Sequence, residues 1–419
     1  MSVQSSSILP PSRSQLPEID SSAARLSTVR GVREDDRAGI RTSDAPSLPF
    51  VVVRTFTIGD PTNKFRQLFP GQFPVVEEDI GHGASFIVQK TSLPVVNPRG
   101  DPTSQYVALK RIRPNSPSTR QSFVSVVADL ICLSHPPLLQ FEKIVSILGL
   151  GWEISPNSAD SRLWPYLILE YSSIGTISDL QQRCTLTYSQ KKSLCCDVAE
   201  ALLVVHHANI IHGDVKSENI LVFPEPDGSF TAKLSDFGYA TMDIDIPADY
   251  GDGGFQFDHE ITETRISTGT YPWTAPECGH VVSWDDASQS DVYSWGLLVW
   301  RVFLDGKNPF IEFNEAFRKI RTPSRPNMAE CIKTWKEKDD VLAVALQFAA
   351  VMDSERENGD HSIRHPFENS LRRSPSRRDL MRGLIAWKLG RTYGSPIALF
   401  LKGITLLGTF VTSTLINFP

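Results

Sequence analysis

The sequence predicts an α+β protein with two lobes, of which the N-terminal lobe is rich in strands and the C-terminal lobe is mostly helical. Short apolar or alternating runs, which are typical of strands, recur between residues 75 and 170. Longer runs with helical spacing follow at 190–209 and 288–303. The chain of 419 residues is long enough for a two-lobed domain of roughly 250–300 residues with tails on either side.

The composition is that of a globular protein, with 41% hydrophobic and 21% charged residues. The net charge of −6 offers no basic footprint for nucleic acid, so we expect no nucleic-acid partner. The six cysteines show no C-x-x-C spacing, which indicates neither a disulfide framework nor a zinc site. A reducing, cytoplasmic location is therefore expected. The first forty residues also lack the apolar segment of a signal peptide.

The N-terminal segment is rich in Ser, Pro, Arg and Asp and contains few large apolar residues. Such a composition cannot bury enough apolar surface to offset the entropy of ordering the chain. We therefore expect residues 1–60 to form a disordered tail.

Order is expected to begin near Phe73, where residues 75–80 and 86–88 read as two strands joined by a tight turn. Gly81 and Gly83 stand at that turn. Glycines in such a place let backbone N–H groups approach phosphate oxygens. Two glycines alone indicate only a turn, so a phosphate-binding role depends on the motifs further along the chain.

The next segments continue the strand-rich part. Residues 91–104 contain three prolines and a glycine and predict a loop. Residues 106–112 alternate as a strand that carries Lys110. The remaining elements expected before residue 210 are a helix at 122–133, strands at 144–152 and 164–170, a linker at 171–175, and helices at 180–184 and 190–209. The last of these is apolar on most faces, which predicts a buried central helix.

The stretch 210–238 carries three polar side chains at informative positions. Asp214 and Asn219 lie on a short loop that leads into a hairpin at 220–234, and Asp236 follows its second strand. The hairpin folds Asp236 back towards Asn219, so one oxygen from each can share a hard divalent cation such as Mg²⁺. Asp214 would then be placed to accept a proton from an attacking hydroxyl.

This stretch, H-x-D-x-K-x-x-N followed by D-F-G, resembles the catalytic loop and metal-binding motif of eukaryotic protein kinases. Further motifs of that family occur in the family order, namely the glycine turn, V-A-L-K ending at Lys110, and A-P-E at 275–277. Ordinary loop and capping residues would not explain all of these together. The resemblance covers residues 75–390 and implies a protein kinase domain there, with the two-lobed protein-kinase-like fold.

The resemblance also implies roles for individual residues. Lys110, Asp214 and Lys216 would be catalytic, and Asn219 and Asp236 would bind Mg²⁺. The residues implied to contact ATP are Gly81, Gly83, Val88, Ala108, Lys110, Glu170, Ser172 and Leu221.

Two structural pairings are implied as well. Asp291 would accept hydrogen bonds from the backbone of the catalytic loop, and Arg378 would pair with Glu277 of the A-P-E motif. A buried pair of this kind fixes geometry more than it adds stability.

Three positions depart from the family pattern. Phe86 stands where the family has its third glycine, and Asp129 stands where it has the glutamate that pairs with the strand lysine. Because aspartate is one methylene shorter, the helix must come closer, or the pair is bridged by water. Gly213 replaces the arginine beside the catalytic aspartate, which removes the commonest route to phosphorylation-dependent switching.

The resemblance favours transfer of the ATP γ-phosphate to Ser or Thr of protein substrates. Lys216 and Thr270 match Ser/Thr-specific members, and Trp273 with the helix at 288–303 is more similar to the tyrosine-kinase-like group. The alternative is a pseudokinase, an ATP-binding or scaffolding module, for which the three departures argue. A small-molecule kinase would share the metal site but would not explain the A-P-E motif.

The C-terminal segment 396–419 is apolar over about the length needed to cross a bilayer. Lys388 and Arg391 lie on its N-terminal side, as expected for a tail anchor with the kinase in the cytosol. An additional helix packed on the large lobe is the other reading, and both remain open.

Overall fold

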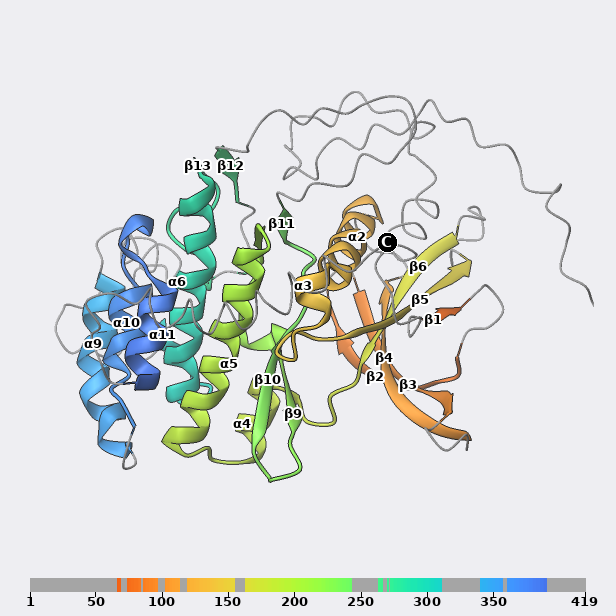
Figure 1. Ribbon diagram of the computed structural model, residues 1–419, viewed down its shortest axis with the longest axis horizontal. Helices are drawn as coiled ribbons and strands as arrows, with labels where there is room; N and C mark the ends of the chain where they lie inside the picture. The colour runs from red at the N-terminus through yellow and green to blue at the C-terminus, as the bar shows by residue number, and fades with distance from the viewer. Residues whose placement is uncertain are drawn as a thin grey trace, which may run out of the picture.

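The computed structural model describes residues 66–68, 74–83, 86–96, 102–113, 119–154, 163–242, 263–266, 270, 272–310, 340–356 and 360–389. These residues form a strand-rich part and a helical part, seen on the right and the left of Figure 1. The two-lobed α+β fold predicted from the sequence is confirmed. The predicted tail at 1–60 and the apolar segment 396–419 lie outside the described residues.

The strand-rich lobe is a six-stranded sheet in the order β1-β5-β6-β4-β3-β2. Its strands are β1 (Arg66–Leu68), β2 (Val76–His82), β3 (Phe86–Val96), β4 (Pro102–Ile112), β5 (Ile147–Ile154) and β6 (Leu163–Glu170). The expectation that order begins near Phe73 is wrong, because β1 precedes it and pairs in parallel with β5. A three-residue strand leaves too little periodicity for a sequence pattern to detect.

The predicted loop at 91–104 is also wrong over most of its length. Strands β3 and β4 pair antiparallel from Phe86 opposite Ile112 to Val96 opposite Pro102. Among the residues that the structure describes, the pairing of β3 with β2 ends at Thr91, and Pro94 lies beyond it in a section that pairs with β4. A strand without a neighbour on one side tolerates a proline.

Helix α2 (Thr119–Ser134) lies against this sheet and is followed by the short α3 (Pro136–Leu139). Val126, Leu130 and Leu133 of α2 are buried, which agrees with the apolar spacing seen in the sequence. Helix α2 thereby contacts β4, the strand that carries Lys110.

The helical lobe is built around α5 (Tyr188–His207) and α6 (Trp284–Phe303), which pack against each other. Burial of Leu194, Val198 and Leu202 confirms that α5 is a central helix. The other α-helices among the described residues of this lobe are α4 (Ile177–Arg183), α9 (Asp340–Met352), α10 (Arg364–Ser370) and α11 (Leu380–Leu389). Thr176 and Thr187 begin α4 and α5 with reciprocal capping boxes.

In the described part of the chain, three small sheets lie outside the six-stranded sheet and flank the segments that carry the predicted site residues. The hairpin of β9 (Ile220–Pro224) and β10 (Phe230–Leu234) forms one sheet with β7 (Gly175–Thr176). Two smaller pairs are β8 (Ile210–Ile211) with β11 (Thr241–Met242), and β12 (Glu263–Arg265) with β13 (Val281–Ser283). They fix the ends of the segments that flank Asp214 and the A-P-E motif.

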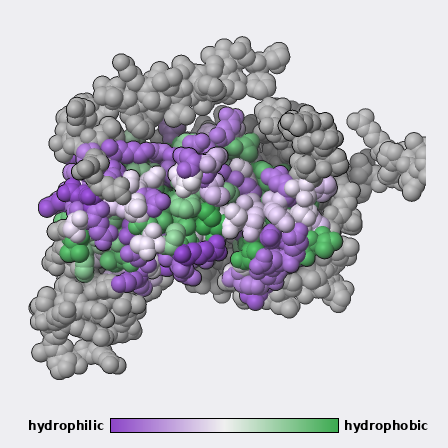
Figure 2. Space-filling view, turned by 90° about the horizontal axis from the view of Figure 1, so that it is seen from below, coloured by the Kyte–Doolittle hydropathy of each residue, from purple (hydrophilic) through white to green (hydrophobic). Residues whose placement is uncertain are grey.

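The surface is mixed in polarity. Figure 2 shows a face on which hydrophilic residues cover much of the area and hydrophobic residues form smaller groups between them. Within the part of the chain that the structure describes, no helix combines the length and apolarity that a bilayer crossing requires.

Candidate active site

The β9–β10 hairpin brings two of the predicted metal ligands together. Leu234 pairs with Ile220 at its open end, and the backbone N–H of Ser235 donates to the Asn219 carbonyl oxygen at 2.9 Å. Asn219 and Asp236 therefore lie side by side, as the sequence predicted. Asp236 adopts a left-handed φ of 64°, a sparsely populated backbone geometry that is frequent at functional sites.

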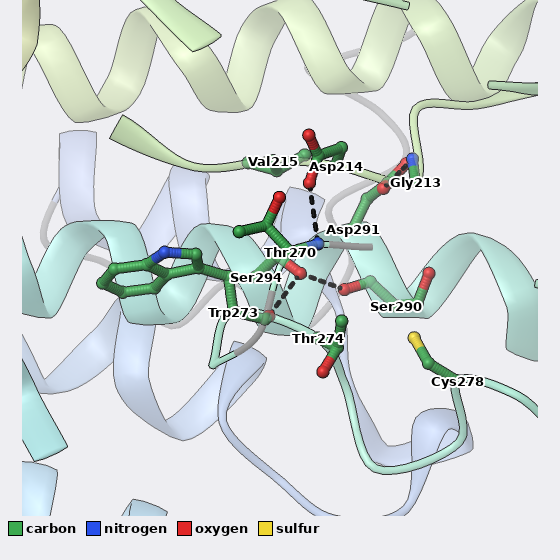
Figure 3. Close-up of a pocket in the computed structure, with 10 residues that line it drawn as sticks. All are labelled: Gly213, Asp214, Val215, Thr270, Trp273, Thr274, Cys278, Ser290, Asp291 and Ser294. Carbon is green, nitrogen blue, oxygen red and sulfur yellow. Dashed lines mark hydrogen bonds between the residues drawn. The ribbon is translucent and has the colours of Figure 1, made fainter. Parts of the chain in front are cut away.

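Asp214 is held at the centre of a polar cluster. The Lys216 ammonium donates to Asp214 Oδ2 and to Thr270 Oγ1, both at 2.5 Å. The Thr270 backbone N–H donates to Asp214 Oδ1 at 2.9 Å (Figure 3). Three residues named separately from the sequence thus form one connected group. Thr270 and Asp214 also line a small pocket. Trp273, just before the A-P-E motif, and Ser290 on α6 line it as well.

The backbone of this loop is fixed from α6. Asp291 accepts hydrogen bonds from the N–H groups of His212 and Gly213, both at 2.8 Å, as predicted. The His206 ring, at the end of α5, lies 2.9 Å from the same carboxylate. Burial alone would raise the pKa of Asp291, but these hydrogen bonds and the nearby imidazoles outweigh it and lower the pKa below its ordinary value.

Gly213 has a local reason to be glycine. Its φ is +77°, and a Cβ built there would lie 2.7 Å from the Tyr239 carbonyl oxygen. The family arginine would therefore not fit this backbone.

Lys110 joins the two lobes. Its buried ammonium lies 2.6 Å from Asp129 Oδ2 and 2.7 Å from Asp236 Oδ1. Burial alone would lower the pKa of Lys110, but the charges of Asp129 and Asp236 outweigh it and raise the pKa. The same pairing with Lys110 lowers the pKa of Asp236 against the effect of burial.

Asp129 makes a direct pair with Lys110, so the water-bridged alternative considered from the sequence is wrong. Its other oxygen accepts the backbone N–H of Phe237 at 2.6 Å. The single carboxylate of Asp129 therefore connects Lys110 on β4 to Phe237 of the D-F-G motif.

The close approach continues along α2. A Cβ built at Gly238 would overlap the Ser125 hydroxyl oxygen. Three residues further than Asp129, the Cys132 sulfur lies 3.5 Å from the Met242 sulfur. Ser125, Asp129 and Cys132 are spaced at i, i+4 and i+7, so one face of α2 contacts the chain from Asp236 to Met242. We call this contact the α2 seam.

The glycine segment agrees with the prediction only in part, because Gly81 lies within β2 and only Gly83 follows the end of that strand. The Gly83 N–H donates to the Phe86 carbonyl oxygen at 2.9 Å, and Gly81 pairs with Val88 across the strands. The ring of Phe86 lies over the Lys110 ammonium, with 4.7 Å from nitrogen to ring centroid. Nothing in the sequence pattern indicated this contact.

Of the remaining residues implied to contact ATP, Val88, Ala108 and Glu170 lie in the sheet that carries Lys110, Leu221 lies in the sheet of β7, β9 and β10, and Ser172 follows the end of β6. Val88 pairs with Lys110, Ala108 pairs with Leu169, and Leu221 is on β9. The side chains of Glu170, the last residue of β6, and of Ser172, in the linker, are bound within the protein. Glu170 accepts from the Ser146 N–H at 2.6 Å and pairs with Lys233 at 2.8 Å, while the Ser172 hydroxyl accepts from the Gly175 N–H at 2.9 Å. Only their backbone could then meet an adenine edge.

The residues fit a divalent cation that also binds phosphate. The Asn219 amide nitrogen donates to Asp214 at 2.8 and 3.0 Å, which orients its oxygen away from that aspartate. The Asp236 side chain is 38% exposed, and only one of its oxygens is given to Lys110. Within the described residues no group of three or more His, Cys, Asp or Glu side chains could hold a metal ion. A site with two protein ligands needs phosphate oxygens to complete it.

A second buried ion pair lies behind the A-P-E motif. Arg378 and Glu277 form a two-pronged pair, with Nη2 to Oε2 at 3.0 Å and a shorter contact from Nη1 to Oε1. The Arg378 guanidinium also donates to the carbonyl oxygens of Arg372 and Gln289 at 2.7 and 2.9 Å. The pairing predicted from the sequence is therefore confirmed.

Sequence reasoning missed His206, Ser125 and the role of Phe86. His206 stands in an ordinary helical run, and its partner Asp291 is 85 residues further along the chain. Ser125 has a small side chain and stands one helical turn before Asp129, and this spacing could have indicated its contact with Gly238.

The two lobes thus bring together a buried lysine, the Asn219–Asp236 pair and a third aspartate, Asp214. A family model described as protein tyrosine and serine/threonine kinase matches residues 75–349. The chain belongs to this protein kinase family. Membership implies ATP and a divalent metal ion in general.

Individual relatives agree with this membership. The chain is 26% identical to serine/threonine-protein kinase pak-2 of Caenorhabditis elegans over 377 residues, which covers 88% of this chain and 60% of pak-2. It is 32% identical to probable serine/threonine-protein kinase PBL17 of Arabidopsis thaliana, over 48% of this chain and 39% of that protein. It is 26% identical to serine/threonine-protein kinase shk1/pak1 of Schizosaccharomyces pombe, over 67% of this chain and 37% of that protein. The chain thus spans less than two thirds of each of these relatives.

Proposed function

We propose that the protein is a Ser/Thr protein kinase that transfers the γ-phosphate of MgATP to hydroxyls of protein substrates. The observation that carries the proposal is the assembly of Lys110, Asp214, Asn219 and Asp236 around one site from both lobes. The names of the relatives, which are serine/threonine-protein kinases, support the same activity. The domain that performs it would span residues 75–390.

The roles follow from the contacts. Asp214 accepts the proton of the substrate hydroxyl. At the same time the hydroxyl oxygen bonds to the γ-phosphorus, and the bond between the γ-phosphorus and the bridging oxygen breaks, so that ADP leaves. Lys216, which already bonds to Asp214 and Thr270, orients that carboxylate. Lys110 positions the phosphates. Asn219 and Asp236 would hold Mg²⁺, which when bound neutralises charge on the phosphates.

Ser/Thr specificity is supported by the Lys216–Thr270 hydrogen bond at 2.5 Å, because both residues match Ser/Thr-specific members. Membership of the tyrosine-kinase-like group stays a prediction, as do a cytoplasmic location and a membrane anchor at 396–419. Protein substrates with Ser or Thr and ATP are the proposed partners.

The pseudokinase alternative rested on Phe86, Asp129 and Gly213. Two of these departures have structural compensation, since Asp129 reaches Lys110 and Gly213 is accommodated by its loop. Phe86 is the departure that still favours the alternative, because its ring covers the lysine. The acceptor and metal-binding residues are otherwise arranged for transfer, so catalysis is the stronger proposal.

A radiometric assay with MgATP and a generic protein acceptor tests the proposal. The wild type should transfer phosphate to Ser or Thr, as phosphoamino-acid analysis would report. Asp214→Asn should retain nucleotide affinity and lower turnover by roughly two or more orders of magnitude, the scale of general-base loss. Asp236→Asn should instead weaken magnesium-dependent binding, because it removes a charged metal ligand. A wild type that binds MgATP but is no more active than Asp214→Asn would identify a pseudokinase.

A further inference from the structure

The Lys110 ammonium is enclosed on three sides. Asp129 and Asp236 lie within 2.6 and 2.7 Å of its nitrogen, and the Phe86 ring covers it at 4.7 Å. The whole residue is only 5% exposed. Two carboxylates therefore accept hydrogen bonds from the Lys110 ammonium, and the Phe86 ring covers the side of the ammonium that faces the glycine turn.

The position of Phe86 follows from strand geometry. Phe86 is the first residue of β3, directly after the turn closed by the Gly83 N–H, and Val88 follows two residues later. Residues i and i+2 of a strand face the same side. Phe86 thus lies on the same side of β3 as Val88, whose partner across the strands is Lys110. A glycine at position 86 would leave only backbone at this place.

The chemistry of the contact sets up a competition. An aromatic face attracts an ammonium through its quadrupole, and the attraction is stronger when the cation is removed from water. Phosphate oxygens are also attracted to an ammonium such as that of Lys110, because they carry negative charge and accept hydrogen bonds from it. The ring and the phosphates cannot both occupy the open side of one buried ammonium.

We propose that Phe86 closes the phosphate subsite of the nucleotide-free protein and must leave Lys110 before ATP phosphates can bind it. The inference rests on the proposed function, since it concerns the same ATP site. Phe86 is then a residue that sets affinity for the phosphate part of the nucleotide. The adenine part, which would meet the linker between the lobes, is independent of it.

Calorimetric titration of the full chain with MgATP and, separately, with adenosine tests the proposal. The variants are Phe86→Leu, which keeps an apolar strand residue without the aromatic face, Phe86→Gly, which restores the family residue, and Phe86→Tyr, which keeps the ring. Loss of a cation–π contact corresponds to a roughly 3- to 30-fold change in affinity. Phe86→Leu and Phe86→Gly should tighten MgATP binding by this factor and leave adenosine binding unchanged, and Phe86→Tyr should resemble the wild type.

The outcomes are distinguishable. If adenosine and MgATP both bind and Phe86→Leu leaves MgATP affinity unchanged or weaker, the inference is overturned and the kinase proposal stands. A parallel gain in adenosine affinity would also overturn it, since the ring would then act on the whole site. A wild type that binds neither ligand would overturn the proposed function and this inference with it. Adenosine binding by each variant also reports that the site is folded.

Discussion

At the scale of single residues, the departures from the family pattern are local adjustments with physical causes. Gly213 is the clearest case, because its backbone is left-handed and its neighbour Tyr239 leaves no room for a Cβ. Asp129 is a second case, since it uses both oxygens, one for Lys110 and one for the Phe237 N–H. Each substitution is thus coupled to the backbone around it.

Gly213→Ala should destabilise the protein by about 2 kcal/mol or more, because a left-handed backbone is combined with a clash. Chemical denaturation of the purified chain measures this. Gly228→Ala is the matched control, since Gly228 has a φ of +84° but a Cβ there would meet nothing within 4 Å. The control should lose only about 1 kcal/mol. Equal losses for the two variants would contradict a steric role for Tyr239.

At the scale of elements, the α2 seam couples a helix of one lobe to the start of the segment that follows the D-F-G motif. The contacts of Ser125, Asp129 and Cys132 lie along one helix face, so a shift of α2 alters all of them together. Tertiary contacts, more than helix propensity, therefore set the position of this helix.

A double-mutant cycle tests the seam. Gly238→Ala should lower kcat by about tenfold, because its Cβ would meet the Ser125 hydroxyl and a serine rotamer in a helix is restricted. Adding Ser125→Ala should restore most of the loss, because the remaining neighbours of that Cβ, Asp236 Oδ1 at 3.2 Å and the Ser125 Cβ at 3.3 Å, are tight contacts and not overlaps. Ser125→Ala alone is the control and should be close to wild type. If the double variant is as slow as Gly238→Ala, the hydroxyl is not the obstacle.

At the scale of the whole molecule, Asp291 joins three parts of the helical lobe, namely the end of α5 at His206, the catalytic loop and α6. Its folded-state pKa lies below the ordinary value of 3.8. A depressed carboxylate pKa stabilises the fold fully above the unfolded-state pKa, and the stabilisation is lost as pH falls through the folded-state pKa.

The wild type should therefore lose unfolding free energy as the pH falls from about 4 towards 3. Asp291→Asn should be less stable than the wild type at neutral pH and show a shallower decline over the acid range. Urea unfolding at a series of pH values measures both. An acid limb of the same slope in the variant would show that other carboxylates account for it.

The fold was predictable where local signals coincide. The β9–β10 hairpin has turn residues between two apolar strands, and it placed Asn219 beside Asp236 correctly. Local signals failed for β1, whose parallel partner β5 is distant in the sequence, and for Pro94, which reads as a loop residue but lies in a strand. They also could not give the contact between Phe86 and Lys110, which depends on the register of two strands.

The hairpin that carries Asn219 and Asp236 has a mechanical consequence. Both residues lie at the open end of one pair of hydrogen-bonded strands, so their spacing belongs to a single rigid unit. Lys110 belongs to the other sheet and reaches this unit through its ion pair with Asp236. Rotation of one lobe against the other therefore leaves the metal-ligand spacing constant and changes the reach of the lysine. The distance between Lys110 Nζ and Asp236 Oδ1 therefore reports how far the two lobes have closed.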